Sequence, residues 1–133
     1  MAHCRRLVVD DGEDFRRFLC LTLIETTECE IVGEASDGLQ AVERAQELQP
    51  DLILLDLGLS TLNGIQTARR IRNLAPNSKM LFVSQNCTLE IAQGALKAGA
   101  HGYLVKSDTN ELTSAISAVS DGEKLLRSRL RQP

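Results

Sequence analysis

Short apolar runs alternate with helix-like segments five times along this chain, and the alternation restricts the fold more than any other feature of the sequence. Most of the runs are almost continuously apolar, as buried parallel strands are. The segments between them carry apolar residues three and four positions apart, which is the stripe of an amphipathic helix. The expected strands are residues 5–9, 30–35, 51–55, 79–84 and 102–106. The expected helices are residues 13–27, 38–49, 64–75, 88–98 and 109–121.

A strand-helix repeat of this kind predicts an α/β fold, because right-handed crossovers between parallel strands place helices on both faces of a sheet. We expect a flavodoxin-like, doubly wound, five-stranded parallel sheet in the order 2-1-3-4-5, inside a three-layer α/β/α sandwich. The apolar run at 52–55 should be central, and the more polar run at 30–35 should form an edge. The first helix should bury Phe15, Phe18 and Leu19.

Length and composition suit one globular domain: the chain has 133 residues, of which 43% are apolar. We expect this domain at residues 1–126, followed by a basic tail or truncated linker at 127–133. A solvated tail is favoured over a binding patch, because charge runs usually lie on the surface. The net charge of −3 argues against direct nucleic-acid binding by this chain and against attraction to an anionic membrane.

The four cysteines form no C-x-x-C pair, and only two histidines are present, so a zinc site is not expected. We interpret the cysteines as reduced thiols, since the chain can build an apolar core and shows no signal peptide. These features predict a cytoplasmic protein.

Charged residues follow directly after several of the predicted strands. Asp10 and Asp11 end the first strand, Asp56 ends the third, and Lys106 ends the fifth. The carboxyl ends of parallel strands meet at one edge of the sheet, and strands one and three are neighbours in the expected order. Carboxylates brought together in this way repel one another unless a cation binds them, and Mg²⁺ favours such oxygen ligands together with phosphate oxygens. Lys106 and the Ser84 hydroxyl would complete the surroundings of a phosphoryl group.

Asp56 is either a metal ligand only or also a nucleophile, because aspartyl phosphates are an established class of covalent intermediate. A phosphatase with an aspartate nucleophile would need an acid two residues later, where this chain has Gly58. We expect no other acidic or histidine side chain near Asp56 to act as a general base. The cluster therefore suits a phosphoacceptor switch better than a turnover enzyme, and a small phosphatase is the weaker hypothesis.

The same residues resemble the receiver domains of two-component response regulators, over about residues 4 to 126. The resemblance implies that Asp56 is the phosphoacceptor for a histidine kinase and that Mg²⁺ is the cofactor. Asp10, Asp11, Asp56 and the Gly58 carbonyl would then hold the metal. The matching segments are Val8-Val9-Asp10-Asp11, Leu54-Leu55-Asp56-Leu57, Asn63-Gly64, Val83-Ser84, Ala98-Gly99-Ala100 and Gly102-Tyr103-Leu104-Val105-Lys106.

The resemblance further implies a switch pair, Ser84 and Tyr103, that remodels the surface of the fourth helix, fifth strand and fifth helix. A homodimer through that surface would follow the same pattern. A half-buried surface ring is an equally weighted interpretation of Tyr103.

Ser107 and Ser60 replace prolines that are common in the family, and Gln85 replaces a small residue. These departures support a second hypothesis, an interaction module that works without phosphorylation. The sub-pattern resembles receivers attached to LuxR-type helix-turn-helix domains.

Overall fold

The structure is a computed structural model and describes residues 5–26, 30–59, 61–85, 88–120 and 125–126. A parallel sheet in the order β2-β1-β3-β4-β5-β6 forms its centre. The strands are β1 Arg5–Val9, β2 Glu30–Ala35, β3 Leu52–Leu55, β4 Lys79–Ser84, β5 Gly102–Val105 and β6 Leu125–Leu126. The helices are α1 Glu13–Thr26, α2 Gly38–Leu48, α3 Gly64–Leu74, α4 Leu89–Lys97, the 3-10 helix η1 Lys106–Glu111 and α5 Leu112–Ser120.

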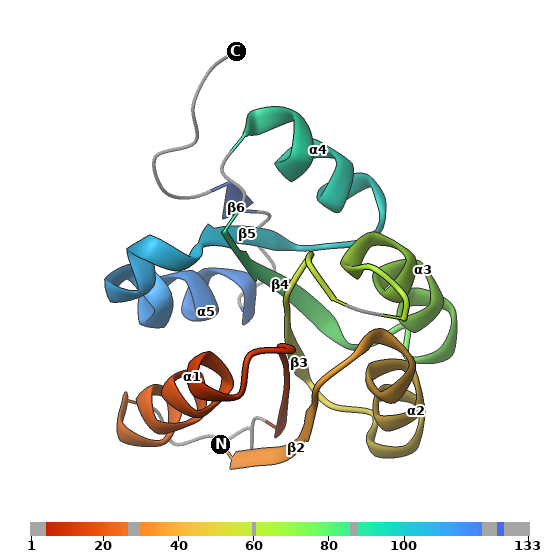
Figure 1. Ribbon diagram of the computed structural model, residues 1–133, viewed down its shortest axis with the longest axis horizontal. Coiled ribbons are helices and arrows are strands. Elements are labelled where there is room, and N and C mark those ends of the chain that lie inside the picture. The colour runs from red at the N-terminus through yellow and green to blue at the C-terminus, as the bar shows by residue number, and fades with distance from the viewer. Residues whose placement is uncertain (1–4, 27–29, 60, 86–87, 121–124, 127–133) are drawn as a thin grey trace.

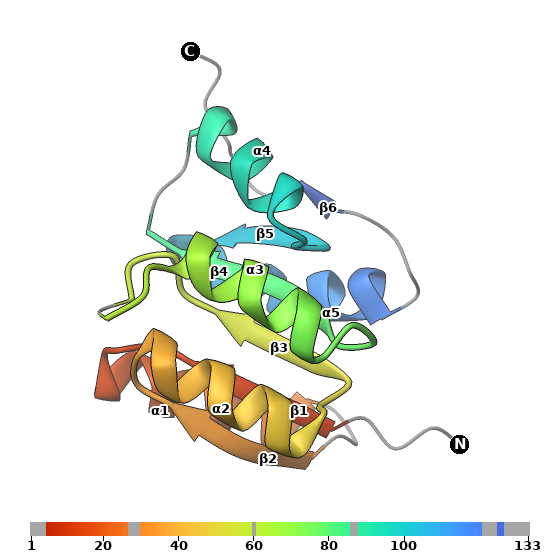
Figure 2. The ribbon, with the colours of Figure 1, turned by 90° about the vertical axis from the view of Figure 1, so that its right-hand side faces the viewer.

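Helices cover both faces of the sheet, as the sequence predicted. Helices α1 and α5 lie on one face, and α2, α3 and α4 lie on the other (Figures 1 and 2). Each face has its own apolar core: one contains Leu19, Leu23 and Ile116, and the other contains Ala45 and Ile71. The flavodoxin-like sandwich and the strand order 2-1-3-4-5 are therefore confirmed.

The sheet has one strand more than the five that were expected. The two-residue strand β6 pairs in parallel with β5, matching Leu125 to Gly102 and Leu126 to Tyr103. Two residues are too few to show an apolar periodicity, so the sequence does not mark this strand. The chain after residue 126, predicted to be a basic tail, lies outside the described residues.

Two other expectations about local structure are wrong. Phe18 is exposed, because Leu19 and Leu23 share the sheet-facing side of α1 and Phe18 lies about 100° around the helix from Leu19. The last helix begins at Leu112 rather than at residue 109, since η1 occupies residues 106–111 first. Lys106 consequently lies in the first position of η1, directly after β5.

The loop after Asp56 packs directly against the start of α3. Asn63 forms a capping box with Gln66, in which each side chain binds the other residue's backbone N–H. At Gly64, a β-carbon would lie 2.5 Å from the Leu57 Cα and 2.6 Å from the Asp56 carbonyl oxygen. Only glycine fits this contact, so α3 begins where it can fix the backbone that carries Asp56. None of the described helices is long and apolar enough to span a bilayer.

Candidate functional site

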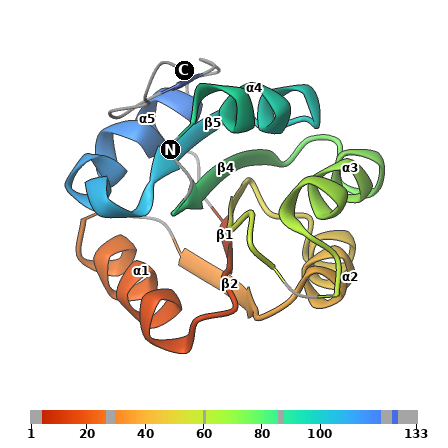
Figure 3. The same cartoon turned by 45° about the horizontal axis from the view of Figure 1, so that its top comes forward.

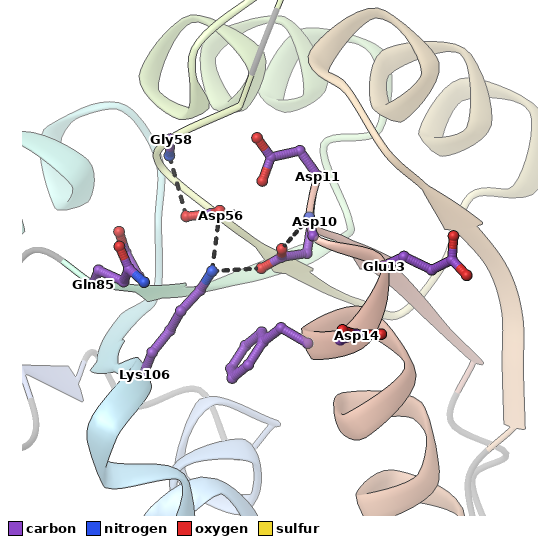
Figure 4. A pocket seen from close by; sticks show the side chains of 11 residues that line it. Asp10, Asp11, Glu13, Asp14, Asp56, Gly58, Gln85 and Lys106 are labelled. Carbon is purple, nitrogen blue, oxygen red and sulfur yellow. Dashed lines mark hydrogen bonds and ion pairs between the residues drawn. The ribbon is translucent and has the colours of Figure 1, made fainter.

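Three carboxylates meet at the carboxyl edge of the sheet. Strands β1 and β3 are direct neighbours, with Val9 paired to Leu55, so the residues that follow them emerge side by side. The Asp56 N–H donates to the Val9 carbonyl oxygen at 3.1 Å and extends this pairing into the site. One carboxylate oxygen from each of Asp10, Asp11 and Asp56 lies within 4.8 Å of the others. The predicted convergence is therefore present in the structure (Figure 4).

Lys106 reaches the carboxylates from β5, on the other side of β4. Its Nζ lies 2.9 Å from Asp10 Oδ2 and 3.3 Å from Asp56 Oδ2, and so bridges two acids from different strands (Figure 4). The same Nζ lies 4.5 Å from the centroid of the Phe15 ring. Asp10 is 1% exposed and the Lys106 side chain 15%, so the bridge is largely withdrawn from water.

Backbone N–H groups hold the other oxygens of the two buried acids. Gly12 N donates to Asp10 Oδ1 at 2.8 Å, and Gly58 N donates to Asp56 Oδ1 at 3.1 Å. These bonds orient the carboxylates, because the second oxygen of each acid faces Lys106: Asp56 Oδ2 accepts a hydrogen bond and Asp10 Oδ2 forms an ion pair. The loop after β1 is also secured by Arg16, whose Nη1 donates to the Asp10 carbonyl oxygen at 2.8 Å. The Arg16 Nε pairs with Glu34 at 3.0 Å.

Burial and pairing act in opposite directions on the charges at this site. Burial raises the pKa of Asp10 above its ordinary value, and the bonds from Lys106 and Gly12 only partly offset that effect. Burial lowers the pKa of Lys106, but the hydrogen bond to Asp10 and the nearby Asp56 charge outweigh it, so this pKa is raised. The charged form of Lys106 is therefore stabilised at this site, whereas nearby positive charge only partly stabilises the charged form of Asp10.

A cleft of about 730 Å³ opens over the carboxylates. Ser84 lies in its wall at the end of β4, paired with Val105, and is buried, whereas the next residue, Gln85, is exposed. The predicted members of the site therefore share one cleft. Its lining residues are Asp10, Asp11, Gly12, Glu13, Asp14, Phe15, Asp56, Gly58, Ser84, Gln85 and Lys106.

Two acids in this lining were not expected. Glu13 and Asp14 belong to the first turn of α1, which overhangs the carboxyl edge of the sheet. Their place in the lining does not contradict the expectation that no acidic or histidine side chain acts as a general base near Asp56, which stays a prediction. Both are solvent-exposed, and Glu13 points away from the three clustered carboxylates (Figure 4).

Tyr103 is fully buried, with 0% of its surface exposed. The ring belongs to the apolar core on the face covered by α2, α3 and α4. Its strand is not at the open edge of the sheet, because β4 lies on one side and β6 on the other. The interpretation of Tyr103 as a half-buried surface ring is therefore wrong.

The oxygen ligands at the site match a hard divalent cation. Mg²⁺ binds carboxylate and carbonyl oxygens and keeps several waters, and the open cleft leaves room for them. The raised pKa of Asp10 shows a carboxylate that a second cation would stabilise. Among the described residues, no histidine or cysteine lines this cleft, so its chemistry is that of oxygen ligands.

Sequence reasoning missed three groups: the Phe15 ring, the Arg16 guanidinium and the Gly12 N–H. The first two lie on α1. The apolar stripe of α1 indicates which side of the helix faces the sheet, but it does not indicate which groups that side contacts at the cleft. A signal was present for Phe15, because it shares the sheet-facing side with Leu19 and precedes it by one turn.

Comparison with known proteins agrees with this fold and this arrangement of residues. The family model of the response regulator receiver domain matches residues 7–117. The chain therefore belongs to the response-regulator receiver family, whose members are signalling domains of two-component systems.

Individual relatives include both transcription regulators and a single-domain protein. The chain is 35% identical to the transcriptional regulatory protein LiaR of Bacillus subtilis, over 95% of this chain and 60% of LiaR. It is 33% identical to the chemotaxis protein CheY of Thermotoga maritima, over 87% of this chain and 97% of CheY. A LuxR-family response regulator from Aurantimonas sp. superimposes with a TM-score of 0.89 at 30% identity, covering 94% of this chain and 90% of that one. The chain spans about three fifths of the length of the curated regulator LiaR.

Proposed function

We propose that this domain accepts a phosphoryl group on Asp56 from the phosphohistidine of a histidine kinase, with Mg²⁺ bound, and changes its α4/β5/α5 surface in response. The observation that carries this proposal is the joint placement of three carboxylates, Lys106 and Ser84 around one cleft. Each group suits a different part of a phosphoryl group, and a metal site alone would have no use for the lysine.

The transfer is a displacement at phosphorus. An Asp56 carboxylate oxygen forms the new P–O bond, the P–N bond to the donor histidine breaks, and its electron pair returns to the imidazole. A divalent ion held by Asp10, Asp11, Asp56 and the Gly58 carbonyl would neutralise the phosphoryl oxygens. Lys106 already contacts Asp56 and needs only a small movement to pair with the incoming charge. Ser84 donates its hydroxyl proton to another phosphoryl oxygen.

The site favours retention of the phosphoryl group over rapid hydrolysis. A β-carbon at Gly58 would lie 3.9 Å from both Asp56 oxygens, so this is the position from which a side chain could act on the phosphoryl group. Glycine supplies no acid or base there. Glu13 and Asp14 line the cleft but are solvent-exposed, and Glu13 points away from the three clustered carboxylates (Figure 4).

Helix α1 provides a surface on which a protein donor can dock. Phe18, Leu21 and Ile24 are exposed by 45%, 55% and 61%, although apolar residues of this size are usually buried. Phe18 adjoins the cleft, because its ring lies 5.8 Å from the ring of Phe15, which lines it. We assign this α1 surface to the histidine kinase, which must bring its phosphohistidine to Asp56.

The output proposal involves Ser84 and Tyr103. Ser84 lies at the end of β4, and the buried Tyr103 belongs to the neighbouring strand β5, where it pairs with Phe82, two residues before Ser84. Movement of the Ser84 hydroxyl towards a phosphoryl oxygen would let the buried ring and α4 adjust together. Figure 3 shows α4, β5 and α5 adjoining one another at one side of the fold. Strand β6 pairs with the outer edge of β5, so a homodimer through this surface would include or displace β6.

The experiment is intact-mass measurement after incubation with acetyl phosphate and Mg²⁺. A single phosphoryl adduct is expected on the wild-type chain, and none on Asp56→Asn or after chelation of the metal. An adduct that persists in Asp56→Asn would refute the assignment. The alternative, an interaction module that works without phosphorylation, is supported by Gln85 at the cleft and predicts partner binding that is unchanged in Asp56→Ala.

Some expectations remain predictions. These are the domain boundary at residue 126, the cytoplasmic location and the lack of direct nucleic-acid binding by this chain. An electrophoretic mobility assay with this chain and duplex DNA tests the last of them.

A further inference from the structure

We infer that Phe15 is a positioning residue for Lys106: its ring holds the lysine ammonium over Asp56, so that the ammonium is in place when a phosphoryl group arrives. This inference rests on the proposed function, and it assigns to α1 a part in the phosphoacceptor chemistry.

The geometry places the ammonium between three partners. Nζ lies 2.9 Å from Asp10, 3.3 Å from Asp56 and 4.5 Å from the Phe15 ring centroid. Asp10 directly follows β1, Asp56 directly follows β3 and Phe15 belongs to α1, so the ammonium has partners from three parts of the fold. A cation within about 6 Å of a ring centroid is attracted by the negative face of the ring.

Burial makes this attraction useful. The Lys106 side chain is only 15% exposed, so its ammonium is largely withdrawn from water. A desolvated cation–π contact is stronger than an exposed one, because water no longer competes for the charge. The ring also limits the rotamers of a long, flexible side chain, and thereby reduces the ordering cost of each later contact.

The ring differs from the other two partners because it is neutral. The negative charge of Asp10 and Asp56 is partly neutralised when a metal binds, and Asp56 changes again when a phosphoryl group is added. The attraction of each acid for the Lys106 ammonium changes with these events. Phe15 neither titrates nor ligates a metal. It can therefore hold Lys106 in the same place before and after the carboxylates change partners.

Phe15 is itself held in position. It packs against the apolar core that contains Leu19 and Leu23, and its ring is tilted by 37° against that of Phe18 at 5.8 Å. The sheet-facing side of α1 thus links the core to the cleft. A ring anchored in this way is a stable support for a lysine that comes from the opposite side of the cleft.

The first test uses metal-free protein. A ring above the Lys106 side chain shifts its terminal methylene proton resonances upfield, and Phe15→Leu should abolish that shift while Phe15→Tyr retains it. Phe15→Met is the second ring-free variant if Phe15→Leu folds poorly. Identical Lys106 resonances in wild type and Phe15→Leu would overturn the inference.

The second test is a double-mutant cycle on binding of beryllofluoride, a phosphoryl mimic, in the presence of Mg²⁺. Phe15→Leu should weaken binding about three- to tenfold, because the freed Lys106 side chain must then be ordered when the mimic binds. Phe15→Tyr should restore the affinity, and the control Leu39→Ala, an exposed apolar residue of α2, should leave it unchanged. In a Lys106→Met background, Phe15→Leu should have no further effect.

The cycle separates a positioning role from a structural one. An equal loss in the Lys106→Met background would show that Phe15 acts on the fold rather than on the lysine, and would overturn the inference. Failure of the wild-type chain to bind beryllofluoride would instead count against the proposed function. The metal-free resonances would then still decide whether Phe15 holds Lys106.

Discussion

Gly64 offers a sharp test of how the fold positions Asp56. Alanine at this position places a β-carbon 2.5 Å from the Leu57 Cα, 2.6 Å from the Asp56 carbonyl oxygen and 3.1 Å from the Leu57 carbonyl carbon. All three are backbone atoms, so no side-chain rotation can relieve the overlap. Overpacking of this kind costs about 1–3 kcal/mol and sometimes more, against a helix-propensity gain of up to about 1 kcal/mol for replacing glycine.

We therefore expect Gly64→Ala to lower the free energy of unfolding by about 2 kcal/mol. With a urea m-value of roughly 2 kcal/mol/M, the midpoint should fall by about 1 M. The matched control is Gly94→Ala inside α4, where a β-carbon meets nothing within 4 Å. That variant should gain about 0.5–1 kcal/mol, so that the same substitution has opposite signs at the two positions.

Equilibrium urea unfolding at 25 °C, followed by far-UV circular dichroism, gives both values. Because the clash is with the backbone of Asp56, Gly64→Ala should also reduce the yield of phosphoryl adduct from acetyl phosphate, and Gly94→Ala should not. A Gly64→Ala midpoint within about 0.2 M of wild type would refute the claim that α3 fixes this loop by direct backbone contact.

Three further predictions concern the site, its partner and a cysteine. Mg²⁺ at about a hundred times its dissociation constant should stabilise the fold by about 2.7 kcal/mol in thermal unfolding, and Asp11→Asn should abolish most of this gain without unfolding the metal-free protein. The double substitution Leu21→Ser with Ile24→Ser should slow phosphotransfer from a histidine kinase at least tenfold, but it should leave labelling by acetyl phosphate unchanged. Equal slowing of both reactions would count against docking of the kinase on α1. Burial is the chief cause that raises the pKa of Cys20 to about 11. Cys20 should therefore react with iodoacetamide at pH 8 at least about a hundredfold more slowly than a peptide cysteine. Its rate should rise about tenfold for each pH unit up to pH 10. This last measurement uses a background in which Cys4, Cys29 and Cys87 are serine, and a rate that is flat with pH would contradict it.

The amino-acid sequence by itself determined the elements of the fold and the composition of the candidate site. Strand and helix periods are local properties, so β1, β2 and β4 begin and end at the predicted residues. General rules for crossovers restrict the possible strand orders, and the order found brings Asp10 and Asp56 to adjacent strand ends.

Only the tertiary structure decided which side chains meet across long sequence separations. Lys106 and Asp56 are 50 residues apart, and nothing in the periodicity of either segment states that the ammonium also binds Asp10 or lies over Phe15. Tyr103 is buried by the core on the face covered by α2, α3 and α4, and β6, which removes β5 from the sheet edge, has too few residues to leave a pattern. Periodicity assigns a residue to one side of its own helix or strand, whereas its contacts depend on how separate elements pack against one another.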